Sequence, residues 1–143
     1  MIVYRERVLP SAANLALPVL LFPSVFAVML PIQASLALPV ATLLTLVFAA
    51  ILITSSPVIV LTESTLTAKT ATIQRKLLGK AQVIPKAEIF EALGQKLDAR
   101  AWLSIQASVK GLVKIEVLDT KDPTPYWLIS TRNPDKLVRE LNQ

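Results

Sequence analysis

The sequence predicts an α+β membrane protein, in which a two-helix transmembrane hairpin precedes a small β-rich cytoplasmic domain. No Asp, Glu, Lys, Arg or His occurs in the 55 residues between Arg7 and Glu63. A soluble fold of that length would need charged side chains on the outer faces of its helices or strands. After Glu63 charges return, and apolar residues alternate with polar ones. This change divides the chain into a lipid-embedded part and a water-exposed part.

Two membrane-spanning helices fit the uncharged segment, because about 20 apolar residues cover a hydrocarbon core of about 30 Å. We expect these helices near residues 11–30 and 36–54. The connection is PIQAS, residues 31–35, in which Pro31 ends the first helix and Ser35 caps the second. The length of the segment therefore suits two helices and a tight turn.

Three other prolines and two alanines fit this hairpin. Pro18 and Pro23 lie inside the first helix and should bend it, which membrane helices tolerate. Pro39 falls in the first turn of the second helix, where a missing N–H matters little. Ala37 and Ala41 permit close helix contact, although small residues at this spacing are common by chance. A cleaved signal peptide is the alternative, but its apolar core would be far too long.

The basic residues predict the orientation. Arg5 and Arg7 precede the first helix, 13 of the 15 basic residues follow the second, and the connecting turn carries none. The positive-inside rule therefore places both termini in the cytoplasm, with the chain in the plasma (inner) membrane. The absence of cysteine agrees with a reducing compartment. We expect a cytoplasmic N-terminus over residues 1–10, a transmembrane hairpin over 11–56 and a cytoplasmic β-rich domain over 57–143.

Alternating and β-branched residues predict several short strands in this domain. The clearest is residues 112–118, in which three apolar residues share one face while Lys114 and Glu116 share the other. The expected strands cover residues 57–64, 65–68, 71–75, 81–84, 102–107, 112–118 and 126–130.

Two short helices complete the domain. Pro85 and Gly94 are typical of the start and end of a helix, and its apolar residues share one side. The last helix begins with Asn133 as its cap and Pro134 at its first position. A curved sheet closed by a terminal helix, as in the pleckstrin-homology-like barrel, covers such strands economically within about 80 residues. An open α+β sheet is the alternative to this curved sheet.

The helix expected between Pro85 and Gly94 has an apolar side that consists of Ile89, Phe90 and Leu93.

The segment DPTPYWLISTRNP, residues 122–134, is the most distinctive of the chain. Its Asp, Thr and Pro residues predict a turn that joins two strands of a hairpin. We expect Trp127 in the interior and Tyr126 on the opposite face. Arg132 should hold the next turn or a nearby carboxylate through its fork of donors, with a lipid phosphate as the functional alternative. The residues with an expected structural role are Asp122, Pro123, Thr124, Pro125, Tyr126, Trp127 and Arg132.

Catalytic groups are scarce in this sequence. The chain contains no His and no Cys, so the usual bases and thiol nucleophiles are absent. Asp119 and Asp122 could bind a divalent cation, but Lys121 lies between them and no third carboxylate is nearby. Solvated loop charges are therefore the preferred interpretation, and we expect no catalytic residue, no cofactor and no metal.

The basic residues nearest the membrane form a second candidate site. Residues 64–87 hold five basic residues and no acid, whereas residues 88–143 hold eight of each sign. Because the cytoplasmic leaflet is anionic, we expect these residues to face lipid headgroups; the alternative is that they only enforce topology. Nucleic acid is not expected, since no aromatic residues interleave with the cluster. The expected patch consists of Lys69, Arg75, Lys76, Lys80 and Lys86.

Several stretches resemble a known family. YRER (residues 4–7), the uncharged hairpin, LDARAW (97–102) and DPTPYWLISTRNPDKL (122–137) are similar to an actinobacterial two-pass membrane-protein family. That family is catalogued as domain of unknown function 3093. The resemblance runs from Tyr4 to about Leu141, and it implies an actinobacterial source and two membrane passes. It implies no reaction.

The sequence as a whole favours a non-catalytic, membrane-anchored accessory or scaffold module. Its domain would contact anionic lipid or a protein partner within a larger membrane complex. A channel is not expected, because the hairpin carries no ionisable group. The alternative is a membrane-bound enzyme or transporter component that uses Asp119, Asp122 and Arg132 on a phosphorylated or lipidic substrate.

Overall fold

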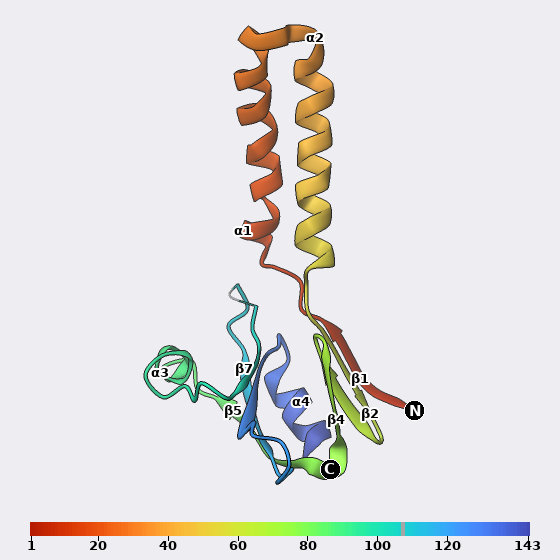
Figure 1. Cartoon of the computed structure of the whole chain (residues 1–143), viewed down its shortest axis with the longest axis vertical. Helices are drawn as coiled ribbons and strands as arrows, with labels where there is room; N and C mark the ends of the chain where they lie inside the picture. Colours follow the sequence, from red (N-terminus) through yellow and green to blue (C-terminus); the bar gives the residue numbers. More distant parts are fainter. Residues whose placement is uncertain (107) are drawn as a thin grey trace. The chain divides into compact units, whose positions relative to one another are not determined.

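The computed structural model describes residues 1–106 and 108–143, and the chain forms two units. The helical unit comprises Leu9–Ser56 (Figure 1). The β-rich unit combines Met1–Val8 with Pro57–Gln143. The residues before the helices thus belong to the same unit as the residues after them, which the sequence analysis did not predict.

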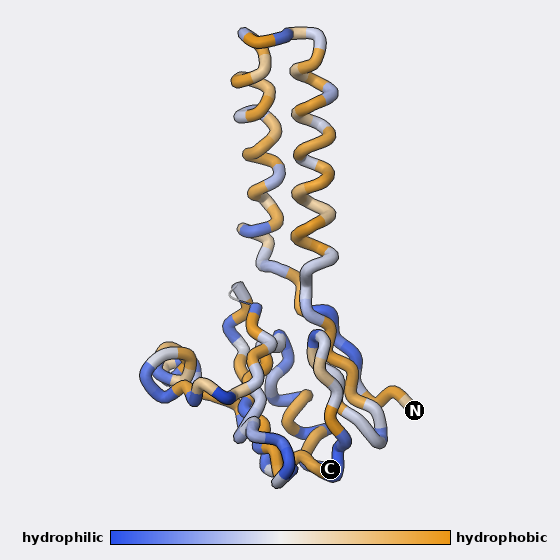
Figure 2. Tube along the Cα trace, viewed as in Figure 1, coloured by the Kyte–Doolittle hydropathy of each residue, from blue (hydrophilic) through white to orange (hydrophobic). Residues whose placement is uncertain are grey.

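The helical unit consists of α1 (Ala12–Leu15) and the much longer α2 (Leu17–Thr54). Ser11 caps α1, since its Oγ accepts from the Asn14 N–H at 3.4 Å. One apolar helical stretch, Ala12–Thr54, is long enough to cross a membrane, and Figure 2 shows that it is hydrophobic along almost all of its length. Large apolar side chains cover its outside, as Val19 at 69% and Ile32 at 70% exposed illustrate.

The backbone of α2 is interrupted at Gln33, whose φ of −157° and ψ of 96° are not helical. In Figure 1 the chain reverses its direction within α2. The expected turn over residues 31–35 is therefore too long, because Pro31 and Ser35 both lie in helical backbone. Pro39 also lies inside the helix, and Pro18 lies at the start of α2 and does not interrupt it. Hence Pro31 ends no helix and Ser35 caps none.

The first sheet of the β-rich unit is four-stranded and antiparallel, in the order β1-β2-β3-β4. Its first strand is formed by residues to which the sequence analysis assigned no structure, and it pairs with the strand that follows the helices, with Arg7 opposite Val58. Lys69 in the turn after β3 has a positive φ of 58°. The strands are β1 (Ile2–Arg7), β2 (Val58–Thr62), β3 (Thr65–Ala68) and β4 (Ala71–Gln74).

The second sheet is also four-stranded, in the order β5-β7-β8-β6. The expected hairpin is confirmed, since β7 and β8 are antiparallel with Ile115 opposite Trp127. The strands β6 and β8 are parallel. The alternation of apolar and polar residues within a strand does not indicate the direction of its neighbour. A short 3-10 helix, Arg75–Leu77, replaces the expected end of the preceding strand, and residue 107 of the expected strand 102–107 lies outside the described residues. The strands are β5 (Leu78–Ile84), β6 (Trp102–Ser104), β7 (Leu112–Val117) and β8 (Tyr126–Ser130).

Two helices accompany the sheets. The helix α3 spans only Ile89–Leu93, because residues 85–88 form a turn closed by the Glu88 N–H and the Pro85 carbonyl at 2.9 Å. The last helix, α4 (Pro134–Leu141), begins with its proline as expected. Asn133 is the N-cap residue, as expected, but its side chain makes no cap hydrogen bond.

The core lies between the two sheets and is closed by α4. Fully buried side chains come from the first sheet (Ile59, Leu66), from the second (Ile115, Ile129) and from the apolar stripe of α4 (Leu137). Burial of such side chains contributes about 1.5–3 kcal/mol each relative to exposure. Two four-stranded sheets thus share one core, and the chain is an α+β protein with a C-terminal helix.

Candidate functional site

The turn between β7 and β8 uses its carboxylates on its own backbone. The Asp119 Oδ1 accepts from the Lys121 N–H at 2.9 Å, and the Asp122 Oδ1 accepts from the Thr124 N–H at the same distance. The hydrogen bonds from Thr124 lower the pKa of the Asp122 carboxyl. Within the described residues, no group of three His, Cys, Asp or Glu side chains could hold a metal ion. These carboxylates shape a turn, as such side chains commonly do.

The aromatic pair after this turn divides between the two faces of β8. Trp127 is 4% exposed in the core, with its ring 6.1 Å from that of Trp102. Tyr126 lies on the other face, where the Lys114 ammonium is 4.2 Å from its ring centre. Its hydroxyl accepts from the Asp98 N–H at 2.8 Å. Tyr126 therefore ties the segment after α3 to the second sheet.

Glu6 of β1 is a polar residue that the sequence analysis missed. The Thr131 hydroxyl donates to its Oε2 at 2.5 Å, and the Arg132 N–H donates to its Oε1 at 2.8 Å. The Tyr4 hydroxyl donates to the same carboxylate. Arg132 therefore binds a carboxylate through its backbone N–H. That carboxylate lies on β1, a strand that the sequence did not predict. We call Tyr4, Glu6, Thr131 and the Arg132 amide the clasp.

The clasp has a pronounced electrostatic character. Burial, and then the hydrogen bond to Glu6, raise the pKa of Tyr4 to about 12. The Thr131 Oγ1 also accepts from the Asn133 N–H at 3.1 Å, so it satisfies a donor beside the first turn of α4. The sequence gives one signal for the clasp. Its residues lie in YRER (4–7) and STRNP (130–134), which both belong to the stretches that carry the family resemblance.

The β-rich unit has one end at which the chain leaves for the helical unit and returns. There the Val8 N–H donates to the Pro57 carbonyl at 2.9 Å, next to the pair of Arg7 and Val58. We call this the tether end. Lys69 belongs to it, because its N–H donates to the Val58 carbonyl at 3.1 Å.

The five expected patch residues do not gather at the tether end. The Arg75 N–H donates to the Ser64 carbonyl at 2.8 Å, which places Arg75 and the adjacent Lys76 at the opposite end of the first sheet from Lys69. The Arg75 guanidinium donates to the carbonyl of Glu140 in the last turn of α4. Lys80 and Lys86 are separated by most of β5. Lys69 and Arg75 therefore lie at different ends of the first sheet, and the Arg75 guanidinium has a structural role.

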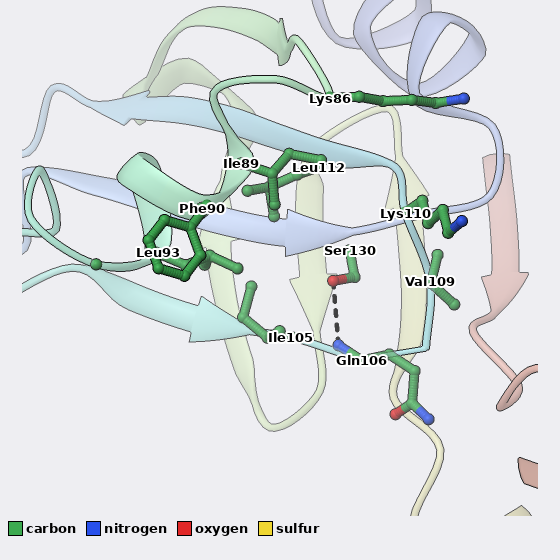
Figure 3. A pocket seen from close by; sticks show the side chains of 11 residues that line it. Lys86, Ile89, Phe90, Leu93, Ile105, Gln106, Val109, Lys110, Leu112 and Ser130 are labelled. Atoms are coloured by element: carbon green, nitrogen blue, oxygen red, sulfur yellow. Dashed lines mark hydrogen bonds between the residues drawn. The ribbon is translucent and has the colours of Figure 1, made fainter.

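A pocket of about 580 Å³ lies between α3 and the end of the second sheet (Figure 3). Its wall is mostly apolar, and among the described residues the charged side chains that line it are Lys86 and Lys110. Both are exposed, and in Figure 3 they extend toward the same side of the pocket. Ser130 in the wall accepts from the Gln106 N–H at 3.1 Å. The apolar wall consists of Ile89, Phe90, Leu93, Ile105, Val109 and Leu112.

The comparisons with known proteins give one match. A family model described as a protein of unknown function (DUF3093) matches residues 3–141. No curated protein and no solved structure matches the chain. The match includes all of β1 except its first residue, the helical unit and the other strands of both sheets, so it covers the clasp and the pocket.

Proposed function

Because the chain belongs to the DUF3093 family, whose description names no activity, we propose a function from its own geometry. It is a non-catalytic, membrane-anchored module, in which a two-helix hairpin holds the β-rich unit at the anionic cytoplasmic surface of the inner membrane. The observation that carries the proposal is the pairing of β1 with β2 across the helical segment.

This pairing constrains how the helical segment can cross a bilayer. Residues 2–7 and 58–62 are neighbours in one sheet, so both must lie on the same side of the membrane. A segment that leaves and returns to one side crosses an even number of times. The 43 residues of Ala12–Thr54 allow two crossings of about 20 residues, with the interruption at Gln33 as the reversal. Both observations support a hairpin.

The exposure of the helical residues supports lipid as their environment. A core helix of a soluble protein is buried by its own fold, whereas most large apolar side chains of α2 are exposed. Ala37 and Ala41 are fully buried, which indicates helix-to-helix contact at the small residues, as in membrane bundles. Apolar surface of this extent is unfavourable in water at about 25 cal/mol per Å².

The charges of the tether end support contact with anionic lipid. The two chain connections keep this end next to any bilayer that the hairpin crosses, and it carries the exposed Arg7 and Lys69. Lys69 occupies left-handed backbone, where glycine or asparagine is favoured. An unfavourable conformation that persists is a signal of function. A basic residue near the cytoplasmic leaflet contributes about 1 kcal/mol.

We assign the β-rich unit a pleckstrin-homology-like architecture within this proposal. Two sheets that share a core and a C-terminal helix that closes it support the assignment. The parallel pair of β6 and β8 departs from a purely antiparallel arrangement. A non-catalytic role is supported by Asp119 and Asp122, whose carboxylates are engaged by the turn.

The topology is tested with single cysteines, since the natural chain has none. Full-length Gln33→Cys, Thr70→Cys and Gln143→Cys variants are treated with an impermeant maleimide in intact spheroplasts and after permeabilisation. We expect Gln33→Cys to react in intact spheroplasts and the other two only after permeabilisation. Labelling of Gln33→Cys and Thr70→Cys under the same condition would contradict the hairpin, and the cysteine-free chain is the control.

The lipid contact is tested with the full chain in nanodiscs. We expect the Thr70→Cys variant to react more slowly in discs that contain phosphatidylserine than in discs of phosphatidylcholine alone. High salt should remove this difference. Lys121→Cys is the matched control, because its turn lies at the opposite end, where the Leu118 N–H donates to the Leu77 carbonyl. Equal Thr70→Cys rates in both kinds of disc would contradict the contact.

A further inference from the structure

We propose that the pocket beside α3 binds one single-chain anionic lipid, with its acyl chain against the apolar wall and its carboxylate or phosphate between Lys86 and Lys110. This inference rests on the proposed membrane anchoring, which supplies the lipid. It assigns a ligand class to a site that differs from the clasp and shares only Lys86 with the expected basic patch.

The part of the apolar wall that α3 contributes lies outside the core of the fold. The three apolar residues of α3 do not pack in the core between the sheets. They line the pocket instead, and Phe90 is 86% exposed. A helix of five residues is too short to be stable through its own hydrogen bonds, so its position depends on what it contacts. An exposed aromatic side chain over a pocket of about 580 Å³ is typical of a small-molecule site.

The rim selects the charge of the ligand. In the described part of the chain, two lysines and no carboxylate line the pocket, so this charged lining is wholly positive. Across the described ranges 1–106 and 108–143, the ion pairs found are those of Met1 with Glu63, Lys96 with Glu91 and Arg100 with Asp98. Lys86 and Lys110 take part in none of them. An anionic head placed between these ammonium groups would gain charge-assisted hydrogen bonds.

The position of the pocket favours a ligand from the bilayer. Lys110 precedes Gly111, whose carbonyl accepts from the Thr131 N–H at 3.0 Å. Thr131 in turn binds Glu6, which precedes Arg7 at the tether end. The basic rim therefore lies toward the end of the unit that the hairpin holds at the membrane. A long apolar wall with one positive rim matches an amphiphile better than a soluble anion, which would leave the wall uncovered.

The test uses the full-length chain in nanodiscs with a photoactivatable fatty acid as the probe, and mass spectrometry locates the labelled peptides. We expect labelling in α2 and also in α3 and residues 105–112. Unlabelled fatty acid and lysophosphatidic acid should both compete at α3, whereas lysophosphatidylcholine should compete less. The relative strength of the two anionic competitors distinguishes a carboxylate ligand from a phosphate ligand.

Two sets of variants separate the head from the chain. Lys86→Gln with Lys110→Gln should lower labelling of α3 about tenfold and leave labelling of α2 unchanged. Leu93→Trp, which keeps both lysines, should fill the pocket and also lower α3 labelling. The matched control is Lys76→Gln with Lys121→Gln, two exposed lysines outside the pocket, which should change nothing.

The outcomes distinguish the two proposals. Absence of labelling in α2 would overturn the membrane anchor itself. Labelling in α2 without labelling in α3, or α3 labelling that neither variant set lowers, would overturn the lipid pocket alone. Capture of the α3 segment of a second copy in the pocket would also overturn it, because the occupant would then be protein.

Discussion

Glu6 accepts a hydrogen bond from the Thr131 hydroxyl at 2.5 Å, although 125 residues separate the two in sequence. Glu6 lies on β1 of the first sheet, and Thr131 lies between β8 of the second sheet and α4. The contact therefore joins both sheets and the closing helix at one carboxylate. Thr131 is completely buried, so an unsatisfied hydroxyl there would be costly.

Replacement of Glu6 by alanine should destabilise the β-rich unit by about 2–3 kcal/mol, because the Thr131 hydroxyl and the Arg132 amide lose a charged acceptor. Thermal unfolding of the detergent-solubilised chain, followed by tryptophan fluorescence, measures this change. The matched control is Arg5→Gln, an exposed neighbour on the same strand, which should alter stability by less than about 0.5 kcal/mol. Equal effects of the two substitutions would show that the clasp adds nothing.

The β-rich unit should lose stability between pH 10 and pH 12 through Tyr4. Its pKa is raised from 10.0 to about 12, first by burial and then by the hydrogen bond to Glu6. The folded state therefore holds the proton more tightly than the unfolded state, so the contribution is complete below pH 10 and is lost as the pH rises toward 12. Unfolding midpoints across this range should fall more steeply for the natural chain than for Tyr4→Phe. Parallel curves would contradict this origin.

Substitution of Gly111 by alanine should disrupt the junction between β7 and the clasp. An added Cβ would lie 2.1 Å from the Thr131 carbonyl oxygen, which is backbone and cannot move aside without breaking the Thr131–Gly111 hydrogen bond. The expected loss of stability is about 1–3 kcal/mol or more, measured by thermal unfolding. Gly94→Ala, whose Cβ would lie 3.0 Å from the Phe90 carbonyl, is the control and should cost less. A larger loss for Gly94→Ala would refute the steric argument.

Replacement of Lys69 by glycine should stabilise the β3–β4 hairpin by roughly 0.5–1 kcal/mol, because the positive φ of 58° is unfavourable for a residue with a Cβ. Hydrogen exchange of the β3 and β4 amides reports the change. Thr70→Gly is the control at the neighbouring turn position, where φ is not positive, and it should destabilise. If Lys69→Gly also lowers the anionic-lipid effect in nanodiscs, the natural lysine trades stability for membrane contact.

The sequence predicted local features of the candidate sites better than it predicted their assembly. The turn chemistry of Asp122 and the burial of Trp127 follow from residue type and alternation, and both are observed. The structure separates Lys69 from Arg75, because Lys69 lies in the turn between β3 and β4 and Arg75 lies at the far end of β4. Proximity in sequence does not show this separation. The presence of Lys86 and Lys110 in the lining of one pocket was not predicted, since it depends on how α3 meets the second sheet.

By itself the sequence determined the uncharged helical segment, most of the strands and the closing helix, because these follow from hydropathy, alternation and capping over neighbouring residues. Only the tertiary structure decided that residues 2–7 complete the first sheet and that β6 lies parallel to β8. It also decided that Glu6 is the carboxylate that accepts a hydrogen bond from the Arg132 N–H. The pairing of β1 with β2 depends on chain closure and backbone hydrogen bonding. The side-chain contact of Glu6 with Thr131 depends on how the two sheets pack. Neither leaves a periodic signal in the amino-acid order.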